Sequence, residues 1–207
     1  MPKQYVSNND ETIRLFENDF LESLSRVHWS IPLVIYIPIS AYLFYYSVIS
    51  FQISFYEIIL NIVGGLFVWT FTEYFLHRFI FHYEPKSELG KRLHFLMHGV
   101  HHDYPKDSKR LVMPPSVSIP LALVFYYIFY QVFSEKYLYI FFASFLWGYL
   151  FYDTVHYAIH HYNMKNKFWL SIKNHHMKHH YQNSLKGFGV SQPTWDVIFK
   201  TDFPDKK

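Results

Sequence analysis

Apolar residues gather in four long segments that are separated by polar stretches. The first segment lies in a run without charged residues from Val27 to Tyr56, and the third is uncharged from Leu111 to Ser134. A helix needs about 20 apolar residues to cross the hydrocarbon core of a bilayer, and such helices tolerate proline. We therefore expect four transmembrane helices, at about residues 31–51, 57–77, 114–134 and 137–157.

The connections between these segments predict how the helices are arranged. The first and second segments are joined near Gln52–Glu57, and the third and fourth near Ser134–Lys136. Connections this short join antiparallel neighbours, so we expect two helical hairpins. No segment shows the two-residue alternation of a transmembrane β-strand. The sequence therefore predicts an all-α integral membrane protein.

Residues 1–30 differ from the rest because they are more polar and read as an amphipathic lead-in. Phe16, Phe20 and Leu24 recur there at helical spacing among scattered charges. This pattern is typical of a helix that lies on a membrane surface. Residues 31–207 are expected to form a single membrane-embedded domain.

The distribution of positive charge predicts the orientation of the helices. Of the 19 Lys and Arg residues, all but Lys136 fall before the first segment, between the second and third, or after the fourth. By the positive-inside rule, the termini and the central loop face the cytoplasm, in the endoplasmic reticulum of a eukaryote or the inner membrane of a bacterium. A soluble four-helix bundle has no reason for this asymmetry. The net charge of +3 gives no indication of a nucleic-acid partner, and we expect none.

Histidine is the most unusual feature of the composition, with 14 residues in a chain that contains no cysteine. Disulfides and thiolate metal sites are excluded, so any metal must bind nitrogen or oxygen. Histidines at i, i+3 and i+4 share one face of a helix and can point at one metal. The twelve clustered residues are predicted metal ligands: His77 and His82; His94, His98, His101 and His102; His156, His160 and His161; His176, His179 and His180.

The clusters lie where the apolar segments end, which favours a metal site in a cytoplasmic helical cap. Helices of about 20 residues through the second and fourth segments end near His77 and His156. The other two clusters lie in the cytoplasmic segments and can close over them, so two metals can be enclosed. A surface protein with merely interfacial histidines is disfavoured because four clusters have ligand spacing. His28 and His175 fall outside the ligand pattern.

The ligand set says more about the type of chemistry than about which metal is bound. Imidazole suits iron, zinc and copper alike. The chain has neither the His-Glu-x-x-His motif of zinc proteases nor the Glu-x-x-His pairs of soluble di-iron bundles. An all-histidine site beneath apolar spans favours oxygen activation on a lipid over hydrolysis. Asp153 and Glu73, each one turn before a predicted ligand, are candidates to accept the second N–H of an imidazole.

These clusters and their flanking residues resemble the fatty acid hydroxylase superfamily of integral-membrane enzymes, and most of all its fatty acid (sphingolipid) 2-hydroxylases. The resemblance covers roughly residues 60–200. The similar stretches are HFLMHGVHHDYPKDSKRLVMPP from His94 to Pro115, YDTVHYAIHH from Tyr152 to His161, and HMKHHYQNSLKGFGV from His176 to Val190, followed by Trp195-Asp196.

The resemblance implies O2-dependent hydroxylation at C2 of a fatty acyl chain, with two electrons consumed and water released. It also implies that the twelve clustered histidines hold dinuclear iron, which zinc can replace in a purified form. Many eukaryotic members carry a cytochrome b5 domain with a His-Pro-Gly-Gly motif, whereas residues 1–30 are too short for it and lack the motif. The expected partners are a membrane lipid and a separate cytochrome b5-like or ferredoxin-like electron donor, docked on the cationic face.

Two other functions compete with lipid 2-hydroxylation. A sterol or carotenoid hydroxylase or desaturase of the same superfamily would share the clusters, but the flanks Arg110–Pro115 and Gly187–Val190 favour the 2-hydroxylase. A metal transporter should place polar ligands near the bilayer midplane, where the predicted spans offer no His, Asp or Glu. Free fatty acid, acyl thioester and ceramide all fit the sequence as substrates.

Overall fold

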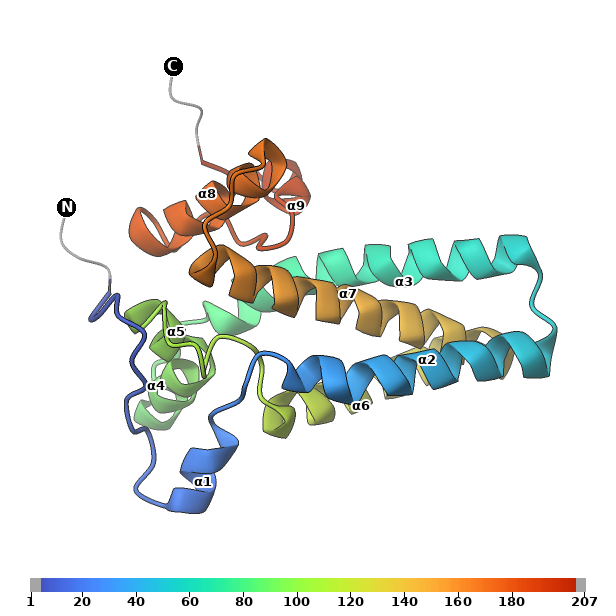
Figure 1. Ribbon diagram of the computed structural model, residues 1–207, viewed down its shortest axis with the longest axis horizontal. Helices are drawn as coiled ribbons and strands as arrows, with labels where there is room; N and C mark the ends of the chain where they lie inside the picture. Colours follow the sequence, from blue (N-terminus) through green and yellow to red (C-terminus); the bar gives the residue numbers. More distant parts are fainter. Residues whose placement is uncertain (1–4, 204–207) are drawn as a thin grey trace.

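Helices dominate the computed structural model, which describes residues 5–203 (Figure 1). This range contains nine α-helices and two π-helices and no strand, so the predicted all-α architecture is confirmed for it. The helices are α1 (Asp19–Leu24), α2 (Ile31–Phe51), α3 (Phe55–Leu76), η1 (His77–Phe81), α4 (Glu88–His94), η2 (Phe95–Gly99), α5 (Val100–Asp103), α6 (Pro115–Val132), α7 (Glu135–His161), α8 (Lys167–Tyr181) and α9 (Thr194–Ile198).

Four helices are long and apolar enough to cross a membrane, in agreement with the four predicted spans. They are α2, α3 continued by η1, α6 and α7, and the chain is therefore a multi-pass membrane protein. α3 begins at a capping box, in which Ser54 and Glu57 satisfy each other's backbone N–H groups. α7 extends to His161, so its last turns lie beyond the end expected near residue 157.

α7 is the central helix of the membrane-spanning part. In its most apolar stretch 78% of the residues are buried, against 11–22% in the other three helices. α3 and α2 pack against α7 more extensively than α6 does. Small residues permit this approach, because a Cβ on Gly148 would lie 2.5 Å from the side chain of Trp69. A Cβ on Gly65 would lie 2.7 Å from the carbonyl oxygen of Phe141.

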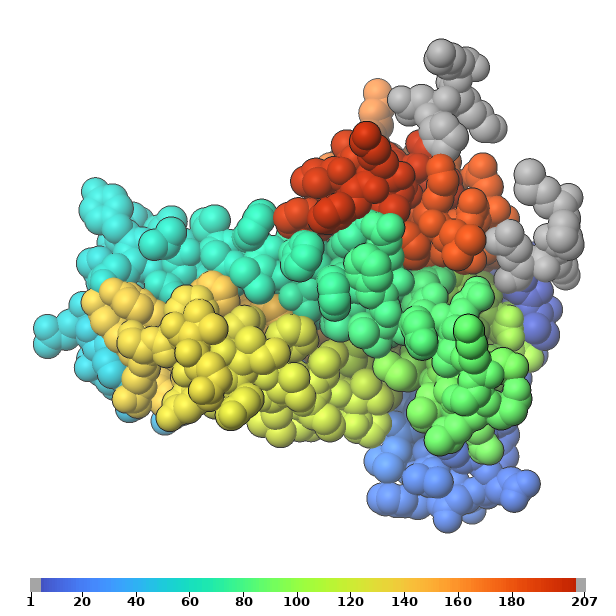
Figure 2. Space-filling model, turned by 180° about the vertical axis from the view of Figure 1, so that it is seen from behind, coloured from blue at the N-terminus to red at the C-terminus, as the bar shows by residue number. Residues whose placement is uncertain are grey.

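The remaining elements gather at one end of the long helices and form a cap that contains α4, η2, α5, α8 and α9 (Figure 1). Seen from behind, residues 85–110 lie between the C-terminal elements and the N-terminal segment (Figure 2). The N-terminal segment is fastened to the loop before α6, where Val27 N–H donates to Lys109 O at 2.8 Å.

The N-terminal lead-in is less helical than its pattern indicates. Between residues 5 and 30 only α1 is helical, so Phe16 precedes the helix, whereas Phe20 and Leu24 lie on it and are exposed. Asn18 caps α1 by accepting hydrogen bonds from the N–H groups of Phe20 and Leu21. Residues 1–4 of the expected lead-in and residues 204–207 of the expected domain lie outside the described residues.

Candidate metal centre

Ten histidines converge where the long helices meet the cap. They form two groups, in each of which one nitrogen per ring lies within 4.8 Å of that of every other member. The first group contains His77, His82, His98, His102 and His179, and the second contains His101, His156, His160, His176 and His180. The groups are neighbours, because the rings of His102 and His180 stack with their centroids 4.3 Å apart.

Each triplet at i, i+3 and i+4 divides its members between the two groups. His98 and His102 belong to the first group, whereas His101 belongs to the second. In α8 the assignment is reversed: His179 belongs to the first group, whereas His176 and His180 belong to the second. Two imidazoles of each triplet therefore lie in one group and the third lies in the other, so neither triplet directs all three rings at one point. Around a helix, i+3 and i+4 lie on opposite sides of residue i, so i+3 can turn toward a second site.

His77 and His82 belong to the same group although they are five residues apart. In an α-helix this spacing directs two side chains to different faces. η1 is a π-helix, in which His82 N–H donates to His77 O at 3.1 Å and residue i+5 lies over residue i. The π turn therefore brings both rings to the first group, and η2 provides a second π turn that contains His98.

The separations between ring nitrogens fit a bound metal ion in each group. Nε2 of His98 lies 3.0 Å from Nε2 of His77 and 3.0 Å from Nε2 of His102. In the second group, Nε2 of His156 and His101 lie 3.0 Å apart. Nitrogens bound at about 2.0–2.1 Å to one metal lie about 3 Å from one another. Lone pairs aimed at one point repel each other unless a cation lies between them.

Burial keeps the imidazoles of the cap in the neutral form that binds metal. Burial lowers the pKa of His98 and His102 well below the usual 6.5, and the neighbouring histidines lower it further. The same two causes lower the pKa of His176 and His180 in the second group. Both groups are therefore ready to accept a cation at neutral pH without first losing protons.

Two backbone carbonyls orient histidines of the first group. Nδ1 of His77 donates to Phe188 O at 2.5 Å, and Nδ1 of His179 donates to Lys186 O at 2.7 Å. A proton on Nδ1 leaves the lone pair of Nε2 free for metal. In the second group, the buried Nδ1 atoms of His156, His176 and His180 find no hydrogen-bond partner among the described residues.

Two of the twelve predicted ligands, His94 and His161, belong to neither group among the described residues. His94 ends α4 and is half-buried. His161 stacks on Tyr157 with ring centroids 4.4 Å apart. Adjacent residues on a helix point about 100° apart, so His161 cannot share the direction of His160. His28 and His175 also lie outside both groups, as the spacing indicates.

The carboxylates of Asp153 and Glu73 accept no hydrogen bond from a ligand imidazole among the described residues, contrary to expectation. Glu73 instead accepts from the N–H groups of Val190 and Ser191, each at 2.7 Å. Oδ1 of Asp153 accepts from Met113 N–H at 3.4 Å, and Oδ2 has no partner within 3.5 Å among the described residues, although the Tyr149 hydroxyl interacts with the carboxylate at longer range. Both side chains therefore accept hydrogen bonds from segments outside their own helices.

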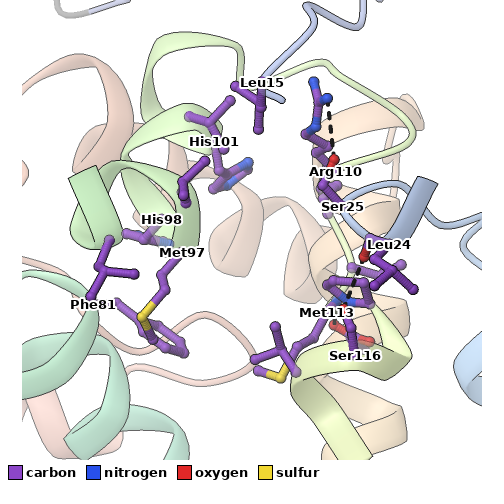
Figure 3. Close-up of a pocket in the computed structure, with 18 of the residues that line it drawn as sticks. Leu15, Leu24, Ser25, Phe81, Met97, His98, His101, Arg110, Met113 and Ser116 are labelled. Carbon is purple, nitrogen blue, oxygen red and sulfur yellow. Dashed lines mark hydrogen bonds between the residues drawn. The ribbon is translucent and has the colours of Figure 1, made fainter. Parts of the chain in front are cut away.

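A cavity of about 320 Å³ adjoins both groups (Figure 3). His98, His101 and His156 form its metal-side wall, and Asp153 is its buried acidic residue. Its other walls come from the N-terminal segment, α4, η2 and the beginning of α6. The lining residues at its mouth are apolar and exposed: Leu21, Leu24, Leu93, Met97 and Val117.

A buried ion pair holds the N-terminal segment over this cavity. Nη2 of Arg110 lies 2.7 Å from Oε1 of Glu22, and both side chains are buried. Arg110 also donates to the carbonyl of Ile13, and Thr12 Oγ1 donates to Asp107 at 2.6 Å. Burial raises the pKa of Glu22, but hydrogen bonds from Arg26 and two backbone N–H groups outweigh it and lower the pKa to about 2.

Sequence reasoning did not identify the cavity lining or the role of the segment after α8. The lining comes from five separate parts of the chain, which no local pattern connects. The segment after α8 does carry a signal, because Gly187 and Gly189 flank Phe188 in the GFGV stretch. Gly187 has φ +70°, and a Cβ on Gly189 would lie 2.1 Å from Gln192 O.

The comparisons with known proteins agree with this geometry. Residues 62–201 match the family model described as fatty acid hydroxylase. The chain is 38% identical to a dihydroceramide fatty acyl 2-hydroxylase of Arabidopsis thaliana, over 91% of this chain and 79% of that protein. It is 37% identical to a fatty acid 2-hydroxylase of Mus musculus, over 94% of this chain and 58% of that protein.

One solved structure has the same fold. It is described as full-length scs7p with only the hydroxylase domain visible. It is 37% identical to this chain, with a TM-score of 0.85 over 91% of this chain and 71% of that chain.

Proposed function

Because the chain belongs to the fatty acid hydroxylase family, we propose that it hydroxylates C2 of a fatty acyl chain, free or in a ceramide-type sphingolipid. The observation that carries this proposal is the pair of five-histidine groups at the wall of a mostly apolar cavity, several of whose apolar lining residues are exposed. In the reaction one C–H bond becomes C–OH. O2 supplies that oxygen, and its second atom leaves as water with two electrons and two protons from a donor.

The two groups fit a dinuclear metal centre with nitrogen ligands only. We assign one ion to each group, because the ring nitrogens of each group converge. Iron is the metal we propose for the active enzyme, and zinc fits the same imidazoles. When bound, iron supplies the activation of O2 and the transfer of oxygen to carbon.

The protein's own part is to place the acyl chain and exclude water. The apolar lining of the cavity holds the chain, and His98, His101 and His156 mark where C2 must lie. Asp153 is the buried acidic residue of the cavity, with one oxygen free of hydrogen bonds among the described residues. It is therefore suited to accept a hydrogen bond from an amide N–H or hydroxyl of the substrate head group.

The membrane sidedness follows from charge. The cap carries exposed lysines, among them Lys165, Lys167 and Lys178, whereas the opposite end has Lys136 alone. By the positive-inside rule the cap faces the cytoplasm, and the spans form two hairpins that enter from that side. An acidic redox protein, such as a cytochrome b5 or ferredoxin, fits this face as electron donor.

Lipid analysis of a host without sphingolipid 2-hydroxylase tests the proposal. The wild type should produce ceramides with 2-hydroxy acyl chains, and His179→Ala should not, because it removes a ligand of the first group. His28→Ala is the matched control, since His28 is exposed and outside both groups. No gain of 2-hydroxy acyl species from the wild type would overturn the proposal. Hydroxylated sterols or carotenoids in their place would favour those substrates.

A further inference from the structure

The segment Gly187–Ser191, between α8 and α9, is held by two buried carboxylates. Oδ1 of Asp196 accepts from Phe188 N–H at 2.9 Å, and Oδ2 accepts from Gly189 N–H at 2.7 Å. Oε1 of Glu73 accepts from the next two N–H groups, at 2.7 Å each. Four consecutive backbone N–H groups therefore bind carboxylates that come from two different helices, α9 and α3.

The carboxylates are themselves fixed by further hydrogen bonds. Thr201 Oγ1 donates to Asp196 at 2.7 Å, and Ser191 Oγ donates to Glu73 at 2.5 Å. Asp196 is fully buried and Glu73 is 3% exposed. A buried carboxylate is stable only when it is compensated in this way, so the segment and the two acids hold each other in place.

The other side of this segment contacts metal ligands. Lys186 O accepts from His179 Nδ1, and Phe188 O accepts from His77 Nδ1. The Phe188 ring packs against His77, His82 and His179, with centroids 5.9, 5.5 and 5.8 Å away. All three histidines belong to the first group. No described residue of the segment donates to or accepts from a histidine of the second group.

Two glycines allow the segment to lie close to its neighbours. A Cβ on Gly187 would lie 2.4 Å from the Phe203 ring, and one on Gly189 would lie 2.1 Å from Gln192 O. The hydrogen bonds to Asp196 and Glu73 hold the backbone next to the carbonyls of Lys186 and Phe188. Those carbonyls set the orientation of two of the five imidazoles in the first group.

We propose that Asp196 and Glu73 are positioning residues for the first group alone, so that the two metals depend on them unequally. This inference rests on the proposed dinuclear centre. Removing a hydrogen-bond partner that orients a metal-bound histidine commonly lowers metal affinity about 10- to 100-fold. Asp196→Asn and Glu73→Gln should therefore weaken the metal at the first group to this extent and leave the second unchanged.

Metal titration of the purified full chain in detergent tests this asymmetry. Metal-free protein is titrated with Zn²⁺ in competition with a chelator, and the amount of zinc bound per chain is measured. Gel filtration verifies that each variant is folded. Wild type should bind two ions tightly, and each of the two variants should bind one tightly and one about 10- to 100-fold more weakly. Asp202→Asn is the matched control, because this acid lies nearby on α9's C-terminal side but binds no N–H of the segment 187–191.

Double variants identify which ion is lost. Asp196→Asn combined with His179→Ala should still retain one tight ion, because both changes act on the first group. Asp196→Asn combined with His180→Ala should retain no tightly bound ion, because the two changes act on different groups. If Asp196→Asn does not fold, Ser191→Ala removes a single hydrogen bond to Glu73 and should produce a smaller change in the same direction.

Two tight ions in both single variants, or equal weakening of both ions, would overturn the inference. A wild type that binds no metal would instead overturn the proposed metal centre, so the two failures are distinguishable.

Discussion

The guanidinium of Arg110 lies 2.7 Å from the carboxylate of Glu22, although 88 residues separate them in the sequence. Both side chains are buried. The pair holds the N-terminal segment against the cavity that adjoins the two histidine groups. The substrate cavity of the proposed enzyme therefore depends on a contact far from its histidines.

Loss of this ion pair should destabilise the protein. Arg110→Ala leaves Glu22 buried with only the half-exposed Arg26 to balance its charge. We expect the free energy of unfolding to fall by about 3 kcal/mol, with faster proteolysis of the N-terminal segment in detergent micelles. Arg14→Ala is the control, because the exposed Arg14–Asp19 pair should contribute about 0–1 kcal/mol. Equal effects of the two substitutions would contradict the prediction.

Stability should also decline in acid through Glu22. Its pKa is lowered from 4.5 to about 2, so the folded chain binds a proton at Glu22 less readily than the unfolded chain does. The stability that the ionised Glu22 contributes is fully present above pH 4.5 and is lost as the pH falls from 4.5 to about 2. Hydrogen exchange of the N-terminal segment should increase over that range. Glu22→Gln should remove this part of the pH dependence, and an unchanged profile would contradict the assignment.

The close contact of α3 and α7 should be sensitive to a single methyl group. Gly148→Ala places a Cβ 2.5 Å from Trp69, and neither helix can yield without moving the core. We expect a loss of about 1–3 kcal/mol, typical of overpacking, measured by thermal unfolding in detergent. Gly64→Ala is the comparison, because its Cβ would meet only the edge of the Phe141 ring at 3.1 Å. A larger loss for Gly64→Ala than for Gly148→Ala would be inconsistent with this packing.

Asp153 should affect substrate use without affecting metal content. Its carboxylate lines the cavity and binds no ligand imidazole among the described residues. Asp153→Asn should therefore lower the rate of 2-hydroxylation while both ions remain bound. Elemental analysis and product assays on the same preparation separate these outcomes. Loss of metal in Asp153→Asn would contradict this prediction. It would instead support the role expected from the sequence, in which Asp153 accepts a hydrogen bond from His156.

Electron delivery to the cap should depend on ionic strength. If the exposed lysines around α8 attract an acidic donor, the rate of donor-dependent turnover should fall as salt rises from low to physiological concentration. Lys178→Glu should reduce that rate and its salt dependence, whereas Lys136→Gln, at the opposite end, should change neither; glutamine is used there because Lys136 pairs with Glu57 at 2.6 Å. A rate indifferent to salt would exclude this docking mode.

The fold was largely predictable from its apolar periodicity and charge. Each of the four spans is long and its composition differs sharply from that of the neighbouring stretches, so local pattern suffices to locate it. The dominance of α7 was not predictable, because it depends on how closely other helices approach Gly148. The irregular stretch before α1 was not predicted either, since it depends on tertiary contacts of Thr12 and Ile13 with Asp107 and Arg110.

The metal site shows a similar division. Spacing identified the histidines that the structure brings together, but it also included His94 and His161. The π turn that unites His77 with His82 has no clear signature in the sequence. The partners of the two carboxylates were not predictable either. Glu73 binds the backbone N–H of Val190, which is 117 residues away in the sequence. Such relationships depend on tertiary structure rather than on local spacing.

The exposed apolar mouth of the cavity, formed in part by Leu21, Leu93 and Met97, changes how substrate affinity must be understood. A lipid that moves sideways from the bilayer into this cavity exchanges one hydrocarbon environment for another, so little hydrophobic free energy is gained. Discrimination between lipids then rests on the head group and on the fit of the tail. The Michaelis constant of such an enzyme is a mole fraction in the membrane, and dilution of the bilayer with inert lipid should inhibit it as competitors do.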